Sequence, residues 1–311
     1  MRGPIAWSLE LGTSGLLKAG SASAPLLAQL PAGTRVFLPA LPAEPPSAIE
    51  EALSLLKREN AGLVPVPHIA ASREESASSL ESRLTAWQRA SGDSVREVLV
   101  VRGDPHAHST EAGSAPVERA GGQFRTSLDL LESDVLQRCG IEAVSLCGHP
   151  EGIAAAGLSA DAARAHLQAK LRWADASGVR ARVVTQFCFD SATATGFVDA
   201  LRADGLAVDV SLGVVSPDVT MELRQRMARR CGVAPPASGF ATPALRRIAR
   251  WQFERGEAAG AQALHLYPFG GLRRCLAKMH AFTTDDSVRL DGSAYANFLL
   301  TPPVPDAYAS K

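Results

Sequence analysis

The sequence alternates short apolar runs with longer segments of helical periodicity, and this alternation recurs eight times. The runs are rich in Val, Leu, Ile and Ala and are mostly apolar on both faces, which is typical of parallel strands covered by helices. They lie at residues 5–11, 35–38, 63–66, 98–101, 143–146, 181–187, 208–212 and 263–266. Eight strand–helix units favour an α/β fold of the (β/α)8 (TIM) barrel type over an open, doubly wound sheet. The absence of a GxGxxG turn after any early strand weakens the doubly wound alternative.

The chain length and composition fit one such barrel. The chain has 311 residues, of which 46% are hydrophobic and 21% are charged, enough to build a sizeable core. We expect a single barrel domain over residues 1–282 and an irregular C-terminal segment over 283–311. A long loop rich in Gly, Ser and Pro follows the fourth strand at 104–123. Loops of this length are either functional lids or disordered.

Charge and cysteine content limit the partners and the compartment. Lys plus Arg equal Asp plus Glu at 32 each, so bulk charge does not draw the chain to nucleic acid or to a membrane surface. No apolar run has the length of a membrane span, and the N-terminus lacks the features of a signal peptide. The five scattered cysteines form no CxxC pair, which favours a reducing compartment. We therefore expect a cytoplasmic protein with a small-molecule substrate. The sequence leaves open whether the protein forms a homo-oligomer.

Polar residues gather where the predicted strands end. In barrels of this type the active site lies at the carboxyl ends of the strands and in the loops that follow. Each of these residues alone has a structural explanation, such as an Arg–Asp pair after the fourth strand. Together they predict a ring of functional groups at one end of the barrel. The ring comprises Glu10, His68, Arg102, Gly103, Asp104, His149, Glu151, Gln186 and Tyr267.

The sequence gives less support to a metal site or to a serine or cysteine nucleophile. Glu10, His68, Asp104 and His149 are metal ligands by residue type. The HxH at 106–108 lies in the long loop, where ligand geometry would be poorly fixed, and we expect no metal. A serine or cysteine nucleophile is disfavoured because there is no GxSxG elbow and no cysteine beside a plausible base.

Several of these segments resemble the methylenetetrahydrofolate reductase family, and in particular its short, divergent bacterial members. The resemblance covers most of the chain, from about residue 5 to residue 282, with the motifs in the family's order. The most specific are VRGD and TQFCFD, at the ends of the fourth and sixth strands. The segments are SLE at 8–10, PHIA at 67–70, VRGD at 101–104, GHPEG at 148–152, TQFCFD at 185–190, RRCGV at 229–233 and YPFGGLRR at 267–274.

The resemblance implies an oxidoreductase of one-carbon metabolism. Its flavin, FAD, would accept hydride from NADH or NADPH and pass it to 5,10-methylenetetrahydrofolate, giving 5-methyltetrahydrofolate. The same chemistry in reverse would serve methyl-group catabolism. The expected cofactor is therefore FAD, the co-substrate is NAD(P)H, and the partner is a tetrahydrofolate derivative.

The resemblance also implies roles for individual residues. Glu10 would be the general acid that protonates N10 and opens the five-membered ring to an iminium ion, which is the hydride acceptor. Asp104 would stabilise cationic character between flavin and folate. The remaining substrate-binding residues would be Gln186, Phe187, Tyr267 and Arg273, and the flavin-binding residues would be His68, Arg102, Gly103, His149, Glu151 and Lys170.

The chain also departs from the family pattern. Gly12 and its neighbours replace the double proline after the first strand, Leu38 replaces a flavin-contacting threonine, and Ile153 replaces a second histidine. Two or three flavin contacts are therefore missing or replaced. Two alternatives follow: a flavin-free, folate-binding barrel, and a metal-dependent barrel hydrolase or lyase.

Overall fold

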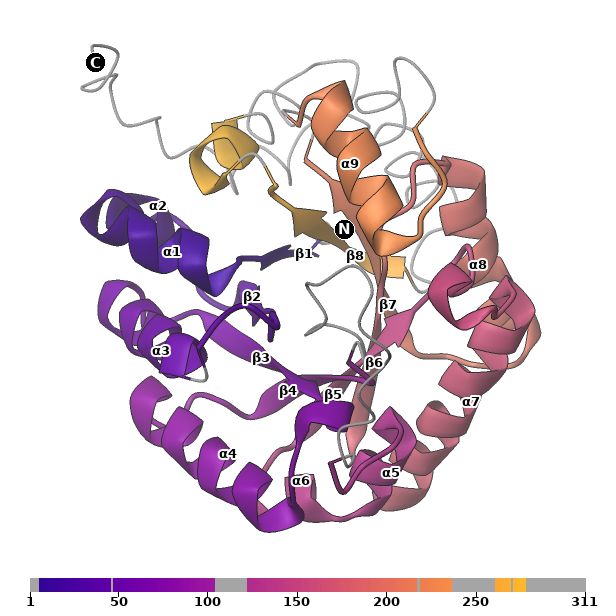
Figure 1. The fold of residues 1–311 in the computed structure, drawn as a ribbon, viewed down its shortest axis with the longest axis horizontal. Coiled ribbons are helices and arrows are strands. Elements are labelled where there is room, and N and C mark those ends of the chain that lie inside the picture. The colour runs from indigo at the N-terminus through magenta and orange to yellow at the C-terminus, as the bar shows by residue number, and fades with distance from the viewer. Residues whose placement is uncertain are drawn as a thin grey trace, which may run out of the picture.

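Eight parallel strands close into a barrel in which each strand pairs with its neighbours in sequence order, from β1 round to β8 (Figure 1). The computed structural model describes residues 6–45, 47–103, 122–216, 219–236, 261–269 and 271–277. The predicted (β/α)8 barrel is confirmed. The strands are β1 (Ala6–Glu10), β2 (Arg35–Leu38), β3 (Val64–Ala70), β4 (Glu97–Val101), β5 (Ala143–Gly148), β6 (Arg180–Thr185), β7 (Asp209–Val215) and β8 (Ala261–Tyr267).

Helices surround the barrel as an outer ring, which Figure 1 shows with the strands at the centre. Residues 272–277, after β8, are also helical. None of the described helices is long and apolar enough to cross a membrane. The helices are α1 (Thr13–Ala19), α2 (Ala24–Ala28), α3 (Ser47–Glu59), α4 (Ala77–Ser91), α5 (Ser127–Glu132), α6 (Val135–Arg138), α7 (Ala160–Ser177), α8 (Ser191–Ala203) and α9 (Met221–Cys231), with short 3-10 turns at Gly20–Ala22, Ala71–Arg73 and Ala154–Ala156.

Strand β3 is longer than the sequence predicts. The sequence predicts its end at Val66. Prolines at 65 and 67 lack the N–H that a sheet uses for pairing. The two prolines are two residues apart, so both missing donors face the same side of the strand. Pairing with β4 then continues through His68 and Ala70. His68 is therefore a residue of the strand itself, held by the barrel, and does not lie in a turn.

The core has two layers. Outward-facing strand residues such as Val36 and Leu38 pack with the helices in one large apolar cluster. Inside the barrel, Phe37, Val66 and Leu99 form a separate cluster with Val184. These inner side chains fill the middle of the barrel, as in other barrels of this size. Polar groups are therefore confined to its two ends.

The amino-terminal end of the barrel is closed by a buried charge network. The carboxylate of Glu97, 4% exposed, accepts from Arg35 Nε at 2.9 Å and from Arg182 Nε at 2.8 Å. Ser145 Oγ also donates to it at 2.7 Å. Because Glu97 and its donors satisfy one another's hydrogen-bonding groups, the network has a structural role. The carboxyl-terminal end of the barrel is therefore the end available for catalysis.

The predicted domain limits are only partly within the described residues. The barrel is described up to residue 277. The predicted boundary at 282 and the segment 283–311 lie outside the described residues, as does the loop 104–121 that contains Asp104.

Candidate active site

A carboxylate between two imidazoles lies inside the carboxyl-terminal end of the barrel. Glu10 is the last residue of β1, His68 lies on β3, and His265 lies on β8. Glu10 Oε2 is 3.8 Å from His68 Nε2 and 3.8 Å from His265 Nε2. Both distances are within ion-pair range and longer than a hydrogen bond. Neither Nε2 atom has a hydrogen-bond partner among the described residues, although both are buried.

Neighbouring side chains fix the orientation of the two rings. Ser8 Oγ lies 2.8 Å from His265 Nδ1, which leaves Nε2 of that ring directed at Glu10. The inward-facing ring of Phe37, on β2, contacts both imidazoles edge-on, with ring centroids 4.7 Å from His265 and 6.0 Å from His68. Ser8 pairs with His265 in the register of β1 and β8. Glu10, two residues further along β1, therefore lies closer to the mouth of the barrel, its carboxyl-terminal opening.

Burial and mutual charge set the protonation of this cluster. Burial acts to raise the pKa of Glu10, but the imidazoles of His265 and His68 lower it by more, so it lies below its ordinary value. Burial lowers the pKa of His68 to about 4, although the charge on Glu10 opposes this. At neutral pH Glu10 is therefore ionised and His68 is neutral.

An aromatic wall borders the cluster on the β6 and β8 side. The ring centroids of Phe187 and Tyr267 lie 5.3 Å apart, and Phe269 packs against both at 5.5 and 5.8 Å. Tyr267 Oη donates to the carbonyl of Thr185 at 3.1 Å. Burial, and then the charge on Glu10, raises the pKa of Tyr267 well above its ordinary value. Tyr267 is thus a neutral, fixed side chain.

Gln186 lies one residue beyond the end of β6, and not within the strand as the sequence suggests. Its backbone N–H donates to the carbonyl of Gly148 at 2.8 Å, and its side-chain Oε1 accepts from the Phe187 N–H at 3.0 Å. The following residue, Phe187, is 1% exposed and serves mainly as packing. Asp190 then caps α8 by accepting from the backbone N–H groups of Ala192 and Thr193.

A second cluster of polar side chains lies near the carboxyl-terminal end of β5. The positive charge of Lys170, on α7, acts on both His149 and the Cys147 thiol. Burial, assisted by that charge, lowers the pKa of His149 to about 4, and burial lowers the pKa of Lys170. Burial raises the pKa of the Cys147 thiol to about 11, so Cys147 is no nucleophile at neutral pH.

The other predicted residues are less closely grouped. Glu151 accepts from the backbone N–H of Ala234 at 2.6 Å and so ties the loop after β5 to the segment after α9. Arg102 is exposed at the end of β4. Gly103 has φ +85°, and a Cβ there would approach Ser72 Oγ to 2.8 Å, so this position needs glycine. Arg273 is exposed on the helix after β8.

His265 is the principal site residue that the sequence prediction missed. It lies in the run ALHLY, which the sequence pattern predicts only as an apolar strand. Alternation along a strand places every second residue inside the barrel, so a histidine in that run was the available signal. It is fully buried, at 0% exposed.

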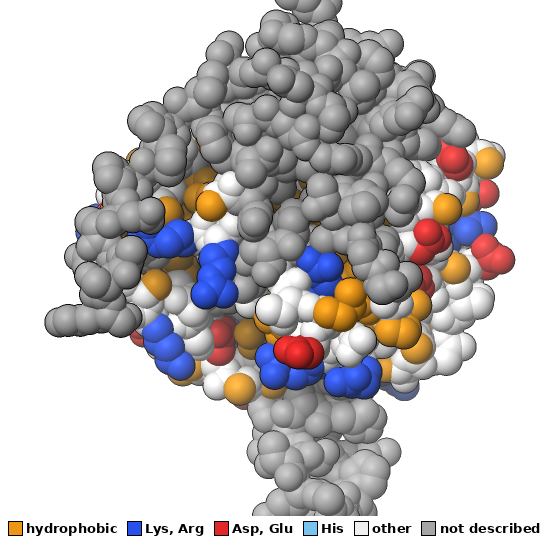
Figure 2. All heavy atoms as spheres, turned by 90° about the horizontal axis from the view of Figure 1, so that it is seen from above, with side chains coloured by type: hydrophobic (Ala, Val, Ile, Leu, Met, Phe, Trp, Pro, Cys, Tyr) orange, Lys and Arg blue, Asp and Glu red, His pale blue; other side chains and the backbone are white. Residues whose placement is uncertain are grey.

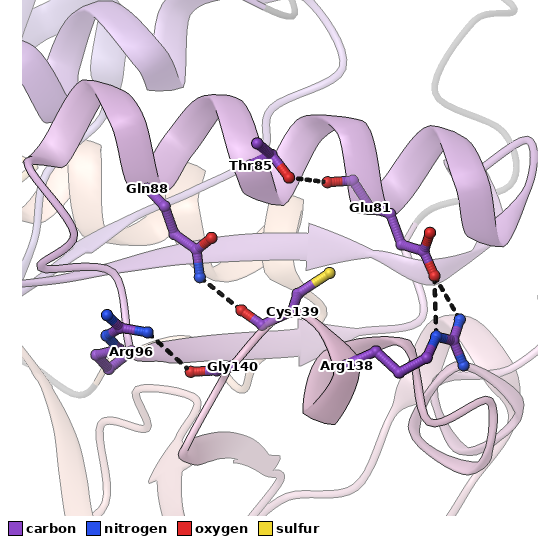
Figure 3. A pocket seen from close by; sticks show the side chains of 7 residues that line it. All are labelled: Glu81, Thr85, Gln88, Arg96, Arg138, Cys139 and Gly140. Atoms are coloured by element: carbon purple, nitrogen blue, oxygen red, sulfur yellow. Dashed lines mark hydrogen bonds and ion pairs between the residues drawn. The ribbon is translucent and has the colours of Figure 1, made fainter.

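The other described surfaces are weaker candidates for a functional site than the mouth of the barrel. A cleft of about 560 Å³ lies between α4 and α6, at the opposite end of the strands (Figure 3). Its polar groups bond one another: Gln88 donates to the Cys139 carbonyl at 2.6 Å, and Arg138 pairs with Glu81. Figure 2 shows Lys and Arg side chains interspersed with apolar and acidic ones on the described part of one face. Within the described ranges, no group of three or more His, Cys, Asp or Glu side chains is arranged to hold a metal ion.

Two solved structures are distantly similar to the chain. No family model matches the chain. The DHPS of Yersinia pestis, solved with a pterine-sulfa conjugate, is 11% identical over 91% of this chain and 93% of its own, with a TM-score of 0.47. The β-mannanase of Thermomonospora fusca, solved with mannohexaose, is 13% identical over 74% of this chain and 76% of its own, with a TM-score of 0.39. Neither likeness is close enough to bear on the function of this chain.

Proposed function

We propose that the chain interconverts 5,10-methylenetetrahydrofolate and 5-methyltetrahydrofolate, with NAD(P)H as the hydride source in the reductive direction. The observation that carries the proposal is the partly buried Glu10 carboxylate between two imidazoles at the mouth of the barrel. The order of the SLE, PHIA, VRGD and TQFCFD segments, which resembles the reductase family, supports it. So does the position of three of these segments, because each ends at or beside this mouth.

The reaction needs a proton-transfer group at this place. Reduction requires N10 of the folate to gain a proton, because the ring-opened iminium carbon accepts hydride and the neutral aminal does not. In the oxidative direction the same nitrogen loses a proton as the ring closes. A single carboxylate held near the reacting carbon can serve both directions, and Glu10 is the carboxylate that lies between the two imidazoles.

The protonation of Glu10 affects the two directions differently. Because its pKa lies below the ordinary value, the resting carboxylate is ionised at neutral pH. That form is ready to accept the N10 proton during oxidation. Reduction requires Glu10 to gain a proton first, and His265 and His68 each place an Nε2 atom 3.8 Å from its Oε2.

Folate would lie against the aromatic wall. Tyr267 and Phe269 present stacked rings with an interplanar angle of 23°, and Gln186 directly follows Thr185, whose carbonyl accepts from Tyr267 Oη. Aromatic faces and one amide suit a planar, hydrogen-bonding pterin. Under the proposal Asp104 and Arg273 bind the pterin and the folate tail, respectively.

FAD is part of the proposal, and the residues at the β5 end fit its phosphates. A partly buried Lys170, beside a neutral His149, offers a positive charge to an anionic group. We expect Lys170 and His149 to bind the phosphates, and Arg102, Gly103, Glu151 and His68 to border the ring system. When bound, the flavin would supply hydride transfer.

One observation favours a flavin-free variant of the same function. The residue of β2 that faces the cluster is Phe37, which offers no hydrogen bond, while Leu38 is fully buried among the helices. A barrel of this type would pass hydride directly between nicotinamide and folate. A colourless purified protein that turns over would establish this variant, and a yellow protein with flavin absorption would rule it out.

Glu10→Gln tests the proposed role of the carboxylate. It keeps the size of the side chain and removes its acid–base function, so folate turnover should fall about 100-fold or more. Reduction of any bound flavin by NAD(P)H should be unchanged. Glu142→Gln, which removes an exposed carboxylate paired with Arg180 on the outside of the barrel, is the matched control. Equal loss in both half-reactions would contradict the assigned role.

A further inference from the structure

Thr185, the last residue of β6, is held by hydrogen bonds from two other strands. Its side-chain Oγ1 accepts from the backbone N–H of Gly213, on β7, at 2.8 Å, and its carbonyl accepts from Tyr267 Oη, on β8, at 3.1 Å. Thr185 is 1% exposed, so both bonds lie in the interior of the protein. Contacts from β7 and β8 therefore fix the peptide group that joins Thr185 to Gln186.

Strand β7 comes unusually close to this peptide group because residue 213 is glycine. A Cβ at Gly213 would lie 2.3 Å from the Thr185 carbonyl oxygen and 2.9 Å from the carbonyl carbon of Gln186. A residue with a Cβ could not approach so closely. On the other side, the N–H of Gln186 donates to the carbonyl of Gly148, on β5, at 2.8 Å. The backbone of Gln186 is thus held from two sides, and its side chain begins at a fixed point.

The amide of Gln186 has a defined orientation, because a backbone N–H can only donate. The N–H of Phe187 faces one end of the amide at 3.0 Å, so that end is the oxygen, Oε1. The other end is Nε2, whose N–H groups can only donate. In the part of the chain that the structure describes, Nε2 has no hydrogen-bond partner, and the residue is partly exposed. A bound molecule therefore meets Gln186 as a donor.

We propose that Gln186 recognises the folate ring through Nε2, as a hydrogen-bond donor, and that Thr185 is the positioning residue that fixes this orientation. The inference rests on the proposed use of folate as substrate and deepens it, because it states which kind of ligand atom this position takes. That atom is an acceptor, either a ring carbonyl oxygen or a ring nitrogen with a free lone pair, and a pterin carries both. A ring that presents an N–H group at this position would be rejected, since two donors would face each other.

Gln186→Glu tests the donor role in the purified full-length protein. Glutamate keeps the length of the side chain and an oxygen for the Phe187 N–H, and it replaces the donor end by a second acceptor. We expect the Kd for 5-methyltetrahydrofolate, measured by isothermal titration calorimetry, to rise at least about fivefold. Gln225→Glu, at an exposed position of α9, adds the same charge and should bind as wild type does. A smaller rise in Gln186→Glu, or tighter binding, would overturn the inference.

Thr185→Val and Thr185→Ser test the positioning role. Valine has nearly the shape of threonine but offers no acceptor to the Gly213 N–H, whereas serine keeps one. Thr185→Val should raise the Kd at least about threefold, and Thr185→Ser should bind nearly as wild type does. In the Gln186→Glu background Thr185→Val should have no further effect, because the contact that it positions is already lost. Equal factors in the two backgrounds, or a smaller effect of Thr185→Val alone, would overturn the positioning role.

Tyr267→Phe takes the place of Thr185→Val in the same comparison if that variant does not fold, since it removes the bond to the Thr185 carbonyl. The measurements also separate this inference from the proposed reaction. Wild type that converts folate, with equal Kd values for wild type and Gln186→Glu, would overturn the inference alone. The expected pattern of Kd values without turnover would support the inference and overturn the proposed reaction. Wild type that binds no folate would overturn both.

Discussion

The buried, neutral state of His68 should be measurable as an acid sensitivity of the folded protein. The ordinary pKa of histidine is 6.5, and burial lowers the pKa of His68 to about 4. The unfolded chain therefore binds a proton at His68 between these two values and the folded chain does not. Stability from this group is fully present above pH 6.5 and is lost as pH falls towards 4.

The size of the effect follows from the two values. Their difference corresponds to about 3 kcal/mol in the free energy of unfolding once the pH is below both. By about pH 4.5 roughly 2.5 kcal/mol of this has been lost. His68→Gln replaces a neutral ring by a neutral amide, so the variant should lose less stability than wild type on acidification, by about this amount.

Urea unfolding at pH 7 and at about pH 4.5, followed by circular dichroism, measures this difference. His149, whose pKa is also about 4, should show a second contribution in His149→Gln. His166→Gln, at an exposed position, should keep the wild-type pH dependence. If His68→Gln and wild type lose stability in parallel between the two pH values, the imidazole is not held neutral by burial and the description of the cluster is wrong.

Two further substitutions probe the wall beside the cluster. Tyr267→Phe removes the hydrogen bond to the carbonyl of Thr185 and should cost about 1 kcal/mol in the free energy of unfolding, with weaker folate binding in a titration; unchanged values for both would contradict the assigned contact. Gly213→Ala would place a Cβ 2.3 Å from that same carbonyl oxygen, so it should cost about 3 kcal/mol or more by thermal unfolding, whereas Gly196→Ala, in α8 with open space around it, should not destabilise the protein.

The fold could be predicted because the strands are apolar on both faces, which few other architectures require. Where the prediction of a strand end failed, pairing between strands in the closed barrel outweighed the local sequence pattern. The predicted strand ends at Val66, but β3 continues to Ala70, and its two prolines leave donors missing on only one side of the strand. The TQFCFD segment was predicted as strand through residue 187, but β6 ends at Thr185.

The candidate site could be predicted only in part. Glu10 and His68 could be identified because each is a polar residue at or just beyond the end of a predicted apolar strand. His265 is surrounded by apolar residues, and its relation to Glu10 depends on the closure of β8 onto β1, across 255 residues of chain (265 minus 10). The low pKa of Glu10 also depends on this closure, since both imidazoles come from other strands.

The most direct test of the proposed function is the conversion of methylenetetrahydrofolate by the purified protein. The protein would be incubated with methylenetetrahydrofolate, NADH or NADPH, and added FAD, and the folates would be separated and identified by mass spectrometry. The account predicts 5-methyltetrahydrofolate formed in proportion to protein and lost in Glu10→Gln. Folded wild-type protein that forms no 5-methyltetrahydrofolate with either nicotinamide, and does not oxidise 5-methyltetrahydrofolate with an electron acceptor, would contradict it.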